Sequence, residues 1–339
     1  MAERGINRRE LVKRGGFTVA GASLFGLAAC GGEGGGAAEE GKDSGGGLVD
    51  RGSIRIEMPT HMIPPDPNTA IMQNGAEQAG KDLGVNVKFR GPEQFSIPQV
   101  QRIFDAAIAA KPSGIAATLP DADALGPLVE KAVDRGIPVV LFNAGLDEYK
   151  ELGALTYIGQ TELQAGEEAG KRLKAAGIKN AIVVNHQQGQ LTLETRYRGV
   201  RDALGGNVKE VAVEGSNPTS IRNGVASALR QNPEVEALIT LGPGAAEQAM
   251  KAIQESGKAE QVKLATFDIS PAVLKAVVAK DILFAIDQQM FFQTYMSVVS
   301  LVNFIQYRVS PVTAVPSGPN FVDATNANDI LKLSEQGIH

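Results

Sequence analysis

The fold is decided by a stretch near the end of the chain, where residues 261–290 read QVKLATFDISPAVLKAVVAKDILFAIDQQM. Two apolar runs, 262–267 and 282–286, are too short for ordinary helices and carry β-branched or aromatic residues, so each predicts a buried strand. Between them, Ser270 and the proline that follows it mark the start of a helix. A strand–helix–strand unit of this kind predicts two parallel strands in one sheet.

Polar side chains stand at the ends of both predicted strands. The first strand ends in Asp268, and the second ends in Asp287-Gln288-Gln289. Ligands of open α/β sheets bind just beyond the carboxyl ends of the strands, so one crevice receives a carboxylate and a carboxamide. This pairing suits a polar, uncharged ligand that is rich in hydroxyl groups. The alternative is that Asp268 and Gln288 are solvated loop residues or helix caps.

Strands and helices alternate over the whole region from residue 53 onward. The other predicted strands are 54–58, 86–89, 114–119, 137–142, 156–158, 181–184, 208–213 and 237–241. The predicted helices are 68–82, 97–110, 123–135, 163–176, 192–204, 219–230, 244–256, 271–280, 291–307 and 326–336, with a loop-like stretch at 309–319. This alternation predicts an α/β fold whose parallel sheets are covered on both faces. We expect two doubly wound lobes, while the length also permits a (β/α)₈ barrel.

The bulk composition is that of an ordinary globular protein. The chain has 339 residues, which suggests about two domains, and a net charge of −5 that becomes more negative without residues 1–29. This acidic balance argues against a nucleic-acid partner. Cys30 is the one cysteine of the sequence, which excludes an internal disulfide and a multi-thiolate zinc site.

The N-terminus is typical of an export signal. Residues 1–29 contain the pair Arg8-Arg9, which resembles a twin-arginine signal, although the general secretory route remains an alternative. An apolar segment too short to span a bilayer then ends in Leu27-Ala28-Ala29-Cys30, which resembles a bacterial lipobox. We therefore expect an exported protein that a lipid on Cys30 anchors to the outer face of the cytoplasmic membrane, or a periplasmic one. A short membrane anchor is the alternative.

Residues 30–52 are expected to form the lipidated cysteine and a tether. The segment 31–47 is rich in glycine and cannot bury apolar surface, so the composition predicts a disordered linker.

Several local patterns together resemble one family. They are Asn74-Gly75-Ala76-Glu77-Gln78-Ala79, Leu83-Gly84-Val85, Gly136-Ile137-Pro138-Val139-Val140, Arg196-Tyr197-Arg198-Gly199, Thr266-Phe267-Asp268 and Ile286-Asp287-Gln288-Gln289. In their order and spacing, the chain from about residue 53 to its end resembles the type I periplasmic sugar-binding proteins, the ribose-binding kind that serve ABC importers. A lipobox fits this resemblance, because Gram-positive members are tethered lipoproteins.

The resemblance implies two Rossmann-like lobes joined by a three-segment hinge. The N-terminal lobe would comprise residues 53–160 and 289–318, and the C-terminal lobe residues 161–288 and 319–339. A small neutral sugar or polyol would lie between the lobes, which close on it, and an ABC permease would receive it. The protein would act as a monomer without a cofactor.

Seven residues are candidates for ligand binding. They are Asp66, Asn68, Asn143, His186, Arg196, Asp268 and Gln288. The resemblance places Asp66, Asn143, Arg196, Asp268 and Gln288 at ligand positions of the family, whereas His186 is a candidate because it follows the strand 181–184. The alternatives are a helix N-cap for Asp66, a turn residue for Asn143, a solvated helix surface for Arg196 and a loop residue for His186.

Two departures from the family bear on the identity of the ligand. Asn68 and Thr69 stand where the family commonly has aromatic side chains that stack on the sugar, and they offer hydrogen bonds instead. Gly242-Pro243 replaces an Asn-Asp pair of the family. The loss of aromatics favours a four- to six-carbon polyol or a small pentose over a hexopyranose.

Two other functions were considered. Gly242-Pro243-Gly244 follows a strand and opens a helix, but the third glycine of a dinucleotide fingerprint is missing, so a Rossmann-type enzyme is the weaker hypothesis. The sequence also lacks the motifs of a P-loop, a nucleophile elbow and a zinc protease. A sensor component that binds a sugar-like signalling molecule and reports to a receptor remains an alternative to import.

Overall fold

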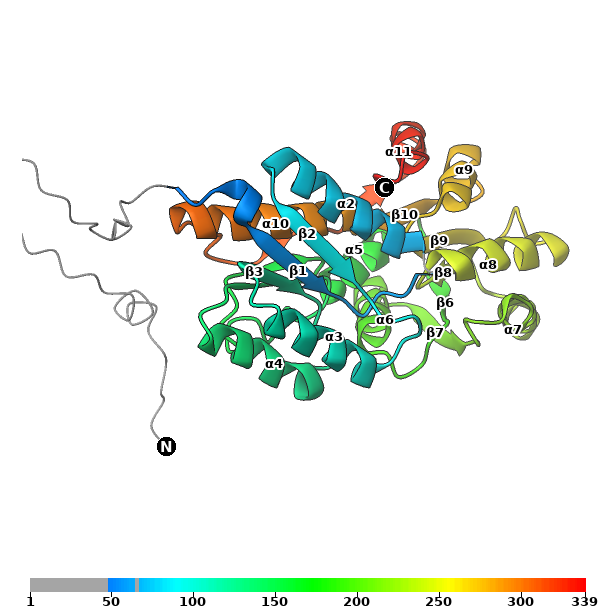
Figure 1. Cartoon of the computed structure of the whole chain (residues 1–339). Coiled ribbons are helices and arrows are strands. Elements are labelled where there is room, and N and C mark those ends of the chain that lie inside the picture. The colour runs from blue at the N-terminus through cyan, green and yellow to red at the C-terminus, as the bar shows by residue number, and fades with distance from the viewer. Residues whose placement is uncertain (1–47, 65–66) are drawn as a thin grey trace, which may run out of the picture. The chain divides into compact units, whose positions relative to one another are not determined.

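In the computed structural model, the described residues are 48–64 and 67–339. The predicted export signal, Cys30, the glycine-rich tether up to residue 47 and Asp66 lie outside the described residues. Within these residues two β-sheets carry the fold, and helices flank both of them (Figure 1).

The first sheet has six strands in the described part of the chain, in the order β2-β1-β3-β4-β5-β11. All neighbouring strands pair in parallel. The strands are β1 Arg55–Pro59, β2 Asn86–Arg90, β3 Gly114–Ala117, β4 Val139–Phe142, β5 Tyr157–Gly159 and β11 Val315–Pro316.

The second sheet, among the same described residues, also has six strands, in the order β7-β6-β8-β9-β10-β12. They pair in parallel except for β12, which is antiparallel to β10. The strands are β6 Asn180–Asn185, β7 Asn207–Ala212, β8 Ala237–Thr240, β9 Lys263–Phe267, β10 Phe284–Asp287 and β12 Asn320–Val322.

Both sheets are covered on both faces. The helices are α2 Pro67–Leu83, α3 Ile97–Ala109, α4 Ala122–Asp134, α5 Glu162–Ala175, α6 Leu191–Leu204, α7 Pro218–Gln231, α8 Pro243–Glu255, α9 Pro271–Ala279, α10 Met290–Tyr307 and α11 Ala327–Ser334, with a short 3-10 helix at Arg51–Ser53. Successive strand residues point to opposite faces. In β3, Ala116 therefore packs in the core under α2 and α10, whereas Ile115 and Ala117 pack under α3 and α4.

In the second sheet, too, successive strand residues point to opposite faces. In β6, Val183 packs with α5 and α6, whereas Ile182 and Val184 pack with α7, α8 and α9. The predicted start of α9 is confirmed, because the Ser270 hydroxyl accepts a hydrogen bond from the Val273 amide at 3.2 Å as an N-cap.

The two sheets repeat one topology, since β2-β1-β3-β4-β5 and β7-β6-β8-β9-β10 have the same order. β4 in the first lobe thus corresponds to β9 in the second. In the described part the chain passes between the sheets after β5, after β10 and after β11. The prediction of two doubly wound lobes is confirmed, and the barrel alternative is wrong.

The main error of the predicted elements concerns the C-terminal part. The stretch 309–319 was expected to be a loop, but it contains β11, and β12 follows it as an antiparallel edge strand. Both strands are two or three residues long and lie at sheet edges, so they carry no readable hydrophobic period. Among the described residues, no helix has the length and apolar character needed to cross a membrane.

Candidate ligand-binding site

The carboxyl ends of β4 and β9 have the same local structure. Phe142-Asn143 ends β4 and Phe267-Asp268 ends β9, and both Asn143 and Asp268 have a φ of 62°. This left-handed backbone is uncommon for residues other than glycine, and Asn and Asp are the residues that tolerate it best. Backbone strain of this kind clusters at functional sites. The two lobes therefore present a carboxamide and a carboxylate from equivalent strand ends.

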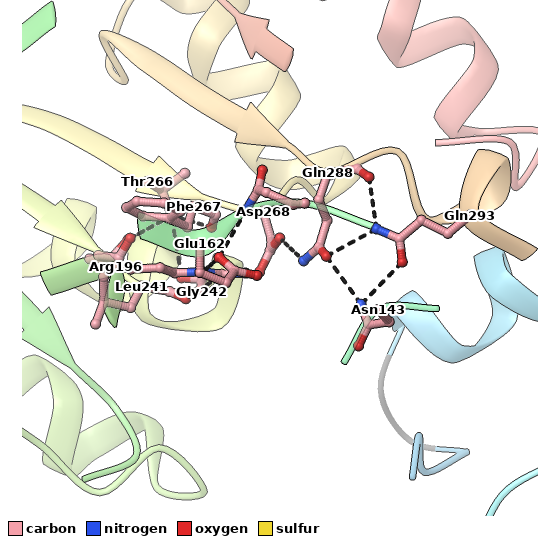
Figure 2. Close-up of polar contacts among 12 residues, drawn as sticks. Asn143, Glu162, Arg196, Leu241, Gly242, Thr266, Phe267, Asp268, Gln288 and Gln293 are labelled. Atoms are coloured by element: carbon pink, nitrogen blue, oxygen red, sulfur yellow. Dashed lines mark hydrogen bonds and ion pairs between the residues drawn. The ribbon is translucent and has the colours of Figure 1, made fainter. Parts of the chain in front are cut away.

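Gln288 joins these two strand ends. It follows β10 and is 4% exposed. Its side-chain Nε2 donates to Asp268 Oδ1 at 2.7 Å, and its Oε1 accepts from Asn143 Nδ2 at 3.1 Å (Figure 2). One carboxamide thus bridges the first lobe, through Asn143, and the second lobe, through Asp268.

Arg196 holds the other oxygen of Asp268. It lies on α6, is 3% exposed, and donates from Nη1 to Asp268 Oδ2 at 3.0 Å and to the Leu241 carbonyl at 3.1 Å (Figure 2). Its Nε and Nη2 donate to the two oxygens of Glu162 at 2.6 and 3.1 Å. Burial opposes the charge of the guanidinium, but Glu162 and Asp268 outweigh it and raise the Arg196 pKa. The guanidinium is therefore permanently charged and fixes both carboxylates in place.

The polar network continues into the hinge. Gln293 is fully buried on α10, and its Nε2 donates to the Gln288 carbonyl at 2.9 Å and to Ser317 Oγ at 3.0 Å. The Ser317 hydroxyl in turn donates to the Gln288 carbonyl at 2.7 Å. Ser317 belongs to the crossing after β11, and Gln288 to the crossing after β10. The groups at the strand ends are thereby tied to two of the segments that join the lobes.

A small recess opens beside these groups, with a volume of about 230 Å³ when the space that is open to solvent is counted. Its lining consists of Asn68, Ile71, Asp268, Ile269, Asp287, Gln288, Met290 and His339. Asn68 comes from the first turn of α2 in the first lobe, and Asp268 from the end of β9 in the second. The recess therefore has walls from both lobes, with a carboxylate and carboxamides on its surface.

This arrangement can exchange hydrogen bonds with hydroxyl groups. The carboxylate of Asp268 accepts, whereas the carboxamides of Asn143 and Gln288 both donate and accept. The positive charge of Arg196 is already neutralised by two carboxylates, so it offers little attraction to an anion. Among the described residues, no group of three or more His, Cys, Asp or Glu side chains is placed to hold a metal ion.

The structure brings most of the predicted residues together. Asn143, Arg196, Asp268 and Gln288 form one hydrogen-bonded network, and Asn68 lines the recess beside it. His186 instead lies at the edge of a second recess beyond β6 and β7. The guanidinium of Arg196, which the resemblance placed at a ligand position, donates in this structure to Glu162, to Asp268 and to the Leu241 carbonyl.

Two residues of this network, Glu162 and Gln293, and a histidine at another strand end, His61, were missed from the sequence. Glu162 stands at the start of α5, and the rule that flagged Asp268, a carboxylate just after a strand, would have found it. Gln293 was not predicted because it lies in a helix that was interpreted as apolar, α10. His61 follows β1 and lies within 2.9 Å of the Thr118 hydroxyl through its Nδ1. Burial lowers the His61 pKa to about 4, so this ring is neutral.

Comparison with known proteins gives a consistent set of relatives. The family model for the periplasmic binding protein domain matches residues 62–308. The crystal structure of a carbohydrate transporter from Acidothermus cellulolyticus 11B, in complex with myo-inositol, is similar with a TM-score of 0.77 and 36% sequence identity, covering 84% of this chain and 99% of that chain. An ABC sugar transporter (periplasmic sugar binding protein) from Legionella pneumophila gives a TM-score of 0.71 and 25% identity, over 78% and 99%.

A sequence relative extends the comparison. The xylose/arabinose-binding protein of Sulfolobus acidocaldarius is 22% identical over 292 residues, which cover 80% of this chain and 72% of that protein.

Proposed function

Because the chain belongs to the periplasmic binding protein family, whose model matches residues 62–308, we propose that it is an extracytoplasmic solute-binding protein. It captures a small neutral sugar or polyol between its two lobes and delivers it to an ABC import permease. A sugar-binding role is supported by the relatives, which include a xylose/arabinose-binding protein and a carbohydrate transporter in complex with myo-inositol.

One observation carries the assignment of the site. Gln288 bridges Asn143 at the end of β4 and Asp268 at the end of β9, so the polar groups of both lobes meet at one point. A ligand hydroxyl that donates to Asp268 and accepts from a carboxamide can replace these internal bonds at little cost, because each group keeps a partner. Asn68 and Arg196 complete the proposed site, the latter by positioning Asp268. Asp66 stays a prediction from the sequence.

The chemistry of the site favours a neutral ligand with closely spaced hydroxyl groups. Arg196 has its charge balanced by Glu162 and Asp268, so it offers little attraction to a carboxylate or phosphate ligand. We therefore propose a four- to six-carbon polyol or a small pentose. The 36% identical relative in complex with myo-inositol, a cyclic polyol, supports this choice.

The lobes are proposed to divide where the sequence suggested, into 53–160 plus 289–318 and 161–288 plus 319–339. The sheet membership of the strands supports these bounds, because each proposed crossing lies between strands of different sheets. The crossings also lie close together. A Cβ on Gly318 would lie 2.6 Å from the side-chain Oε1 of Gln160 and 3.3 Å from the backbone of Asp287 and Gln288, so the third crossing lies against a side chain of the first and the backbone of the second.

Membrane anchoring through Cys30 is a separate proposal. It rests on the sequence Leu27-Ala28-Ala29-Cys30. Cys30→Ser should abolish lipid labelling and release the protein from the membrane, and unchanged labelling in that variant would exclude the anchor.

The proposed function is tested by a thermal-shift screen of the protein from residue 48 onward. The panel comprises myo-inositol, erythritol, xylitol, xylose, arabinose, ribose and glucose. A rise in melting temperature with a polyol or pentose supports the proposal, because a ligand that binds the folded state alone stabilises it by about 2.7 kcal/mol at a concentration of a hundred times Kd. A rise with glucose alone would contradict the ligand class, and no rise with any compound would contradict sugar binding.

A further inference from the structure

A second recess lies in the C-terminal lobe, beyond the carboxyl ends of β6 and β7. It encloses about 1130 Å³, counting the space that is open to solvent, and its polar lining comprises His186, Gln187, Gln188, Glu214, Ser216 and Ser220. The loop after β7 contains Glu214-Gly215-Ser216, and the small side chains of Gly215 and Ser216 leave the space open. Its walls are fixed by backbone bonds, from the Gly215 amide to the His186 carbonyl at 3.0 Å and from the Val213 amide to the Asn185 carbonyl at 2.9 Å.

His186 occupies a slot between two glycines. A Cβ on Gly242 would lie 2.8 Å from its Cε1 atom, and a Cβ on Gly215 would lie 3.2 Å from its Cβ and Cδ2 atoms. A side chain at position 242 would require the ring to move, whereas one at position 215 would also meet the His186 carbonyl oxygen at 2.5 Å, since contacts below 3.0 Å are excluded. The ring therefore fills the space that a side chain at position 242, directly after β8, would otherwise take.

The ring of His186 has unused hydrogen-bonding capacity. Its Nδ1 is buried and has no hydrogen-bond partner among the described residues. Burial lowers its pKa, so the ring is neutral. Burying an unpaired N–H is rarer than burying an unpaired acceptor, which favours the tautomer that carries its proton on Nε2. His186 thus offers one neutral donor.

His186 connects this recess to the site at Asp268. The Leu241 carbonyl accepts from Arg196 (Figure 2). The next residue, Gly242, packs against the His186 ring. The negative charge of Asp268 raises the pKa of His186, and the positive charge of Arg196 lowers it. A continuous set of contacts, from Asp268 through Arg196 and Leu241-Gly242 to the His186 ring, therefore links the site to the second recess.

The lining of the recess defines what it can hold. It has one carboxylate, Glu214, together with hydroxyls and carboxamides, and it has no lysine or arginine. This chemistry disfavours phosphate and carboxylate groups, and it suits a neutral ring that carries several hydroxyls.

We propose that the recess lined by His186, Glu214 and Ser220 is a second sugar subsite, so that the preferred ligand is a two-ring glycoside of the sugar or polyol bound at Asp268 and Gln288. This inference rests on the proposed function, because it assigns an extension to the same site. One ring contacts the strand ends of both lobes, and the second ring lies in the recess of the C-terminal lobe.

Isothermal titration calorimetry with matched one-ring and two-ring compounds tests the proposal. The pairs are myo-inositol with its galactoside galactinol, and xylose with xylobiose. For at least one pair, the two-ring compound should bind the wild-type protein about tenfold or more tightly than its one-ring partner, which corresponds to about 1.4 kcal/mol.

Ser220→Leu fills the recess, and Thr219→Leu is the matched control on an exposed neighbour outside it. Ser220→Leu should remove the gain from the second ring while one-ring binding and melting temperature change little, and Thr219→Leu should keep the gain. The subsite is refuted if one-ring compounds bind the wild type as tightly as two-ring ones, or if Ser220→Leu leaves the gain intact. If neither class binds the wild type, the proposed function itself has failed, and the subsite falls with it.

Discussion

Asp268 shows how one side chain at a strand end can hold several partners. Its Oδ1 accepts from Gln288 and its Oδ2 from Arg196, while its backbone adopts a left-handed conformation. The position of Asp268 could be predicted from the sequence, because the rule of carboxyl strand ends needs only the strand boundary. Its partners could not be predicted in the same way. Glu162 meets Arg196 across 34 positions of sequence, and only the packing of α5 on α6 brings them together.

The charge of Asp268 should matter for affinity. Asp268→Asn keeps the size of the side chain but removes a charged acceptor, so we expect a loss of about 1.5–3 kcal/mol of binding free energy. This loss corresponds to about a ten- to hundredfold increase in Kd, measured by calorimetry with the best compound of the screen. Asp281→Asn, at an exposed position, is the control and should bind like the wild type. Wild-type affinity in Asp268→Asn would mean that the ligand lies elsewhere.

Arg196 should contribute strongly to stability. Arg196→Met leaves Glu162 and Asp268, two largely buried carboxylates, without their common partner, and breaking a buried ion pair in this way costs about 3–5 kcal/mol. Urea unfolding of the ligand-free protein measures this loss. Arg201→Met on the same helix removes an exposed pair with Asp202 and should leave the unfolding curve unchanged. Equal unfolding midpoints for the two variants would show that Arg196 has no such structural role.

At the scale of elements, the alternation of strands and helices was readable because buried parallel strands are short apolar runs and the covering helices have their own period. The element bounds in the structure differ from the predicted ones mostly by one or two residues. β11 and β12 could not be predicted, because edge strands of two and three residues are too short to show a hydrophobic period. The close contact of α5 and α6 was also not readable, although it positions Arg196.

That contact depends on glycines. A Cβ on Gly166 of α5 would lie 2.4 Å from the Arg196 carbonyl, and one on Gly199 of α6 would lie 2.5 Å from the Leu163 carbonyl. Gly166→Ala should therefore push the helices apart and lower the free energy of unfolding by about 1–3 kcal/mol, even though alanine is the better helix former. Urea unfolding should show this loss, together with weaker ligand binding from the displacement of Arg196.

Gly244→Ala on α8 is the matched control, because a Cβ there meets nothing within 4 Å. It should leave stability unchanged or raise it by up to about 1 kcal/mol. A Gly166→Ala protein as stable as this control would show that the two helices can separate without cost.

At the scale of the whole molecule, two lobes have the same topology, and their polar groups meet where the chain crosses between them. Asn143 comes from one lobe, Asp268 from the other, and Gln288 from a crossing. We expect a ligand that bonds to all three to hold the lobes closed on it by a hinge motion. The identity of the ligand could not be predicted from the sequence, because it depends on side chains that both lobes contribute to the site and on the proposed second subsite.

Small-angle X-ray scattering tests this central claim most directly. Residues 48–339 are measured without ligand and with a saturating concentration of the best compound of the screen, for the wild type and for Asp268→Asn. We predict that the ligand lowers the radius of gyration of the wild type, and that the same concentration leaves Asp268→Asn unchanged or less compacted. A wild-type protein that calorimetry shows to be saturated, but whose radius of gyration stays the same, would contradict ligand binding between closing lobes.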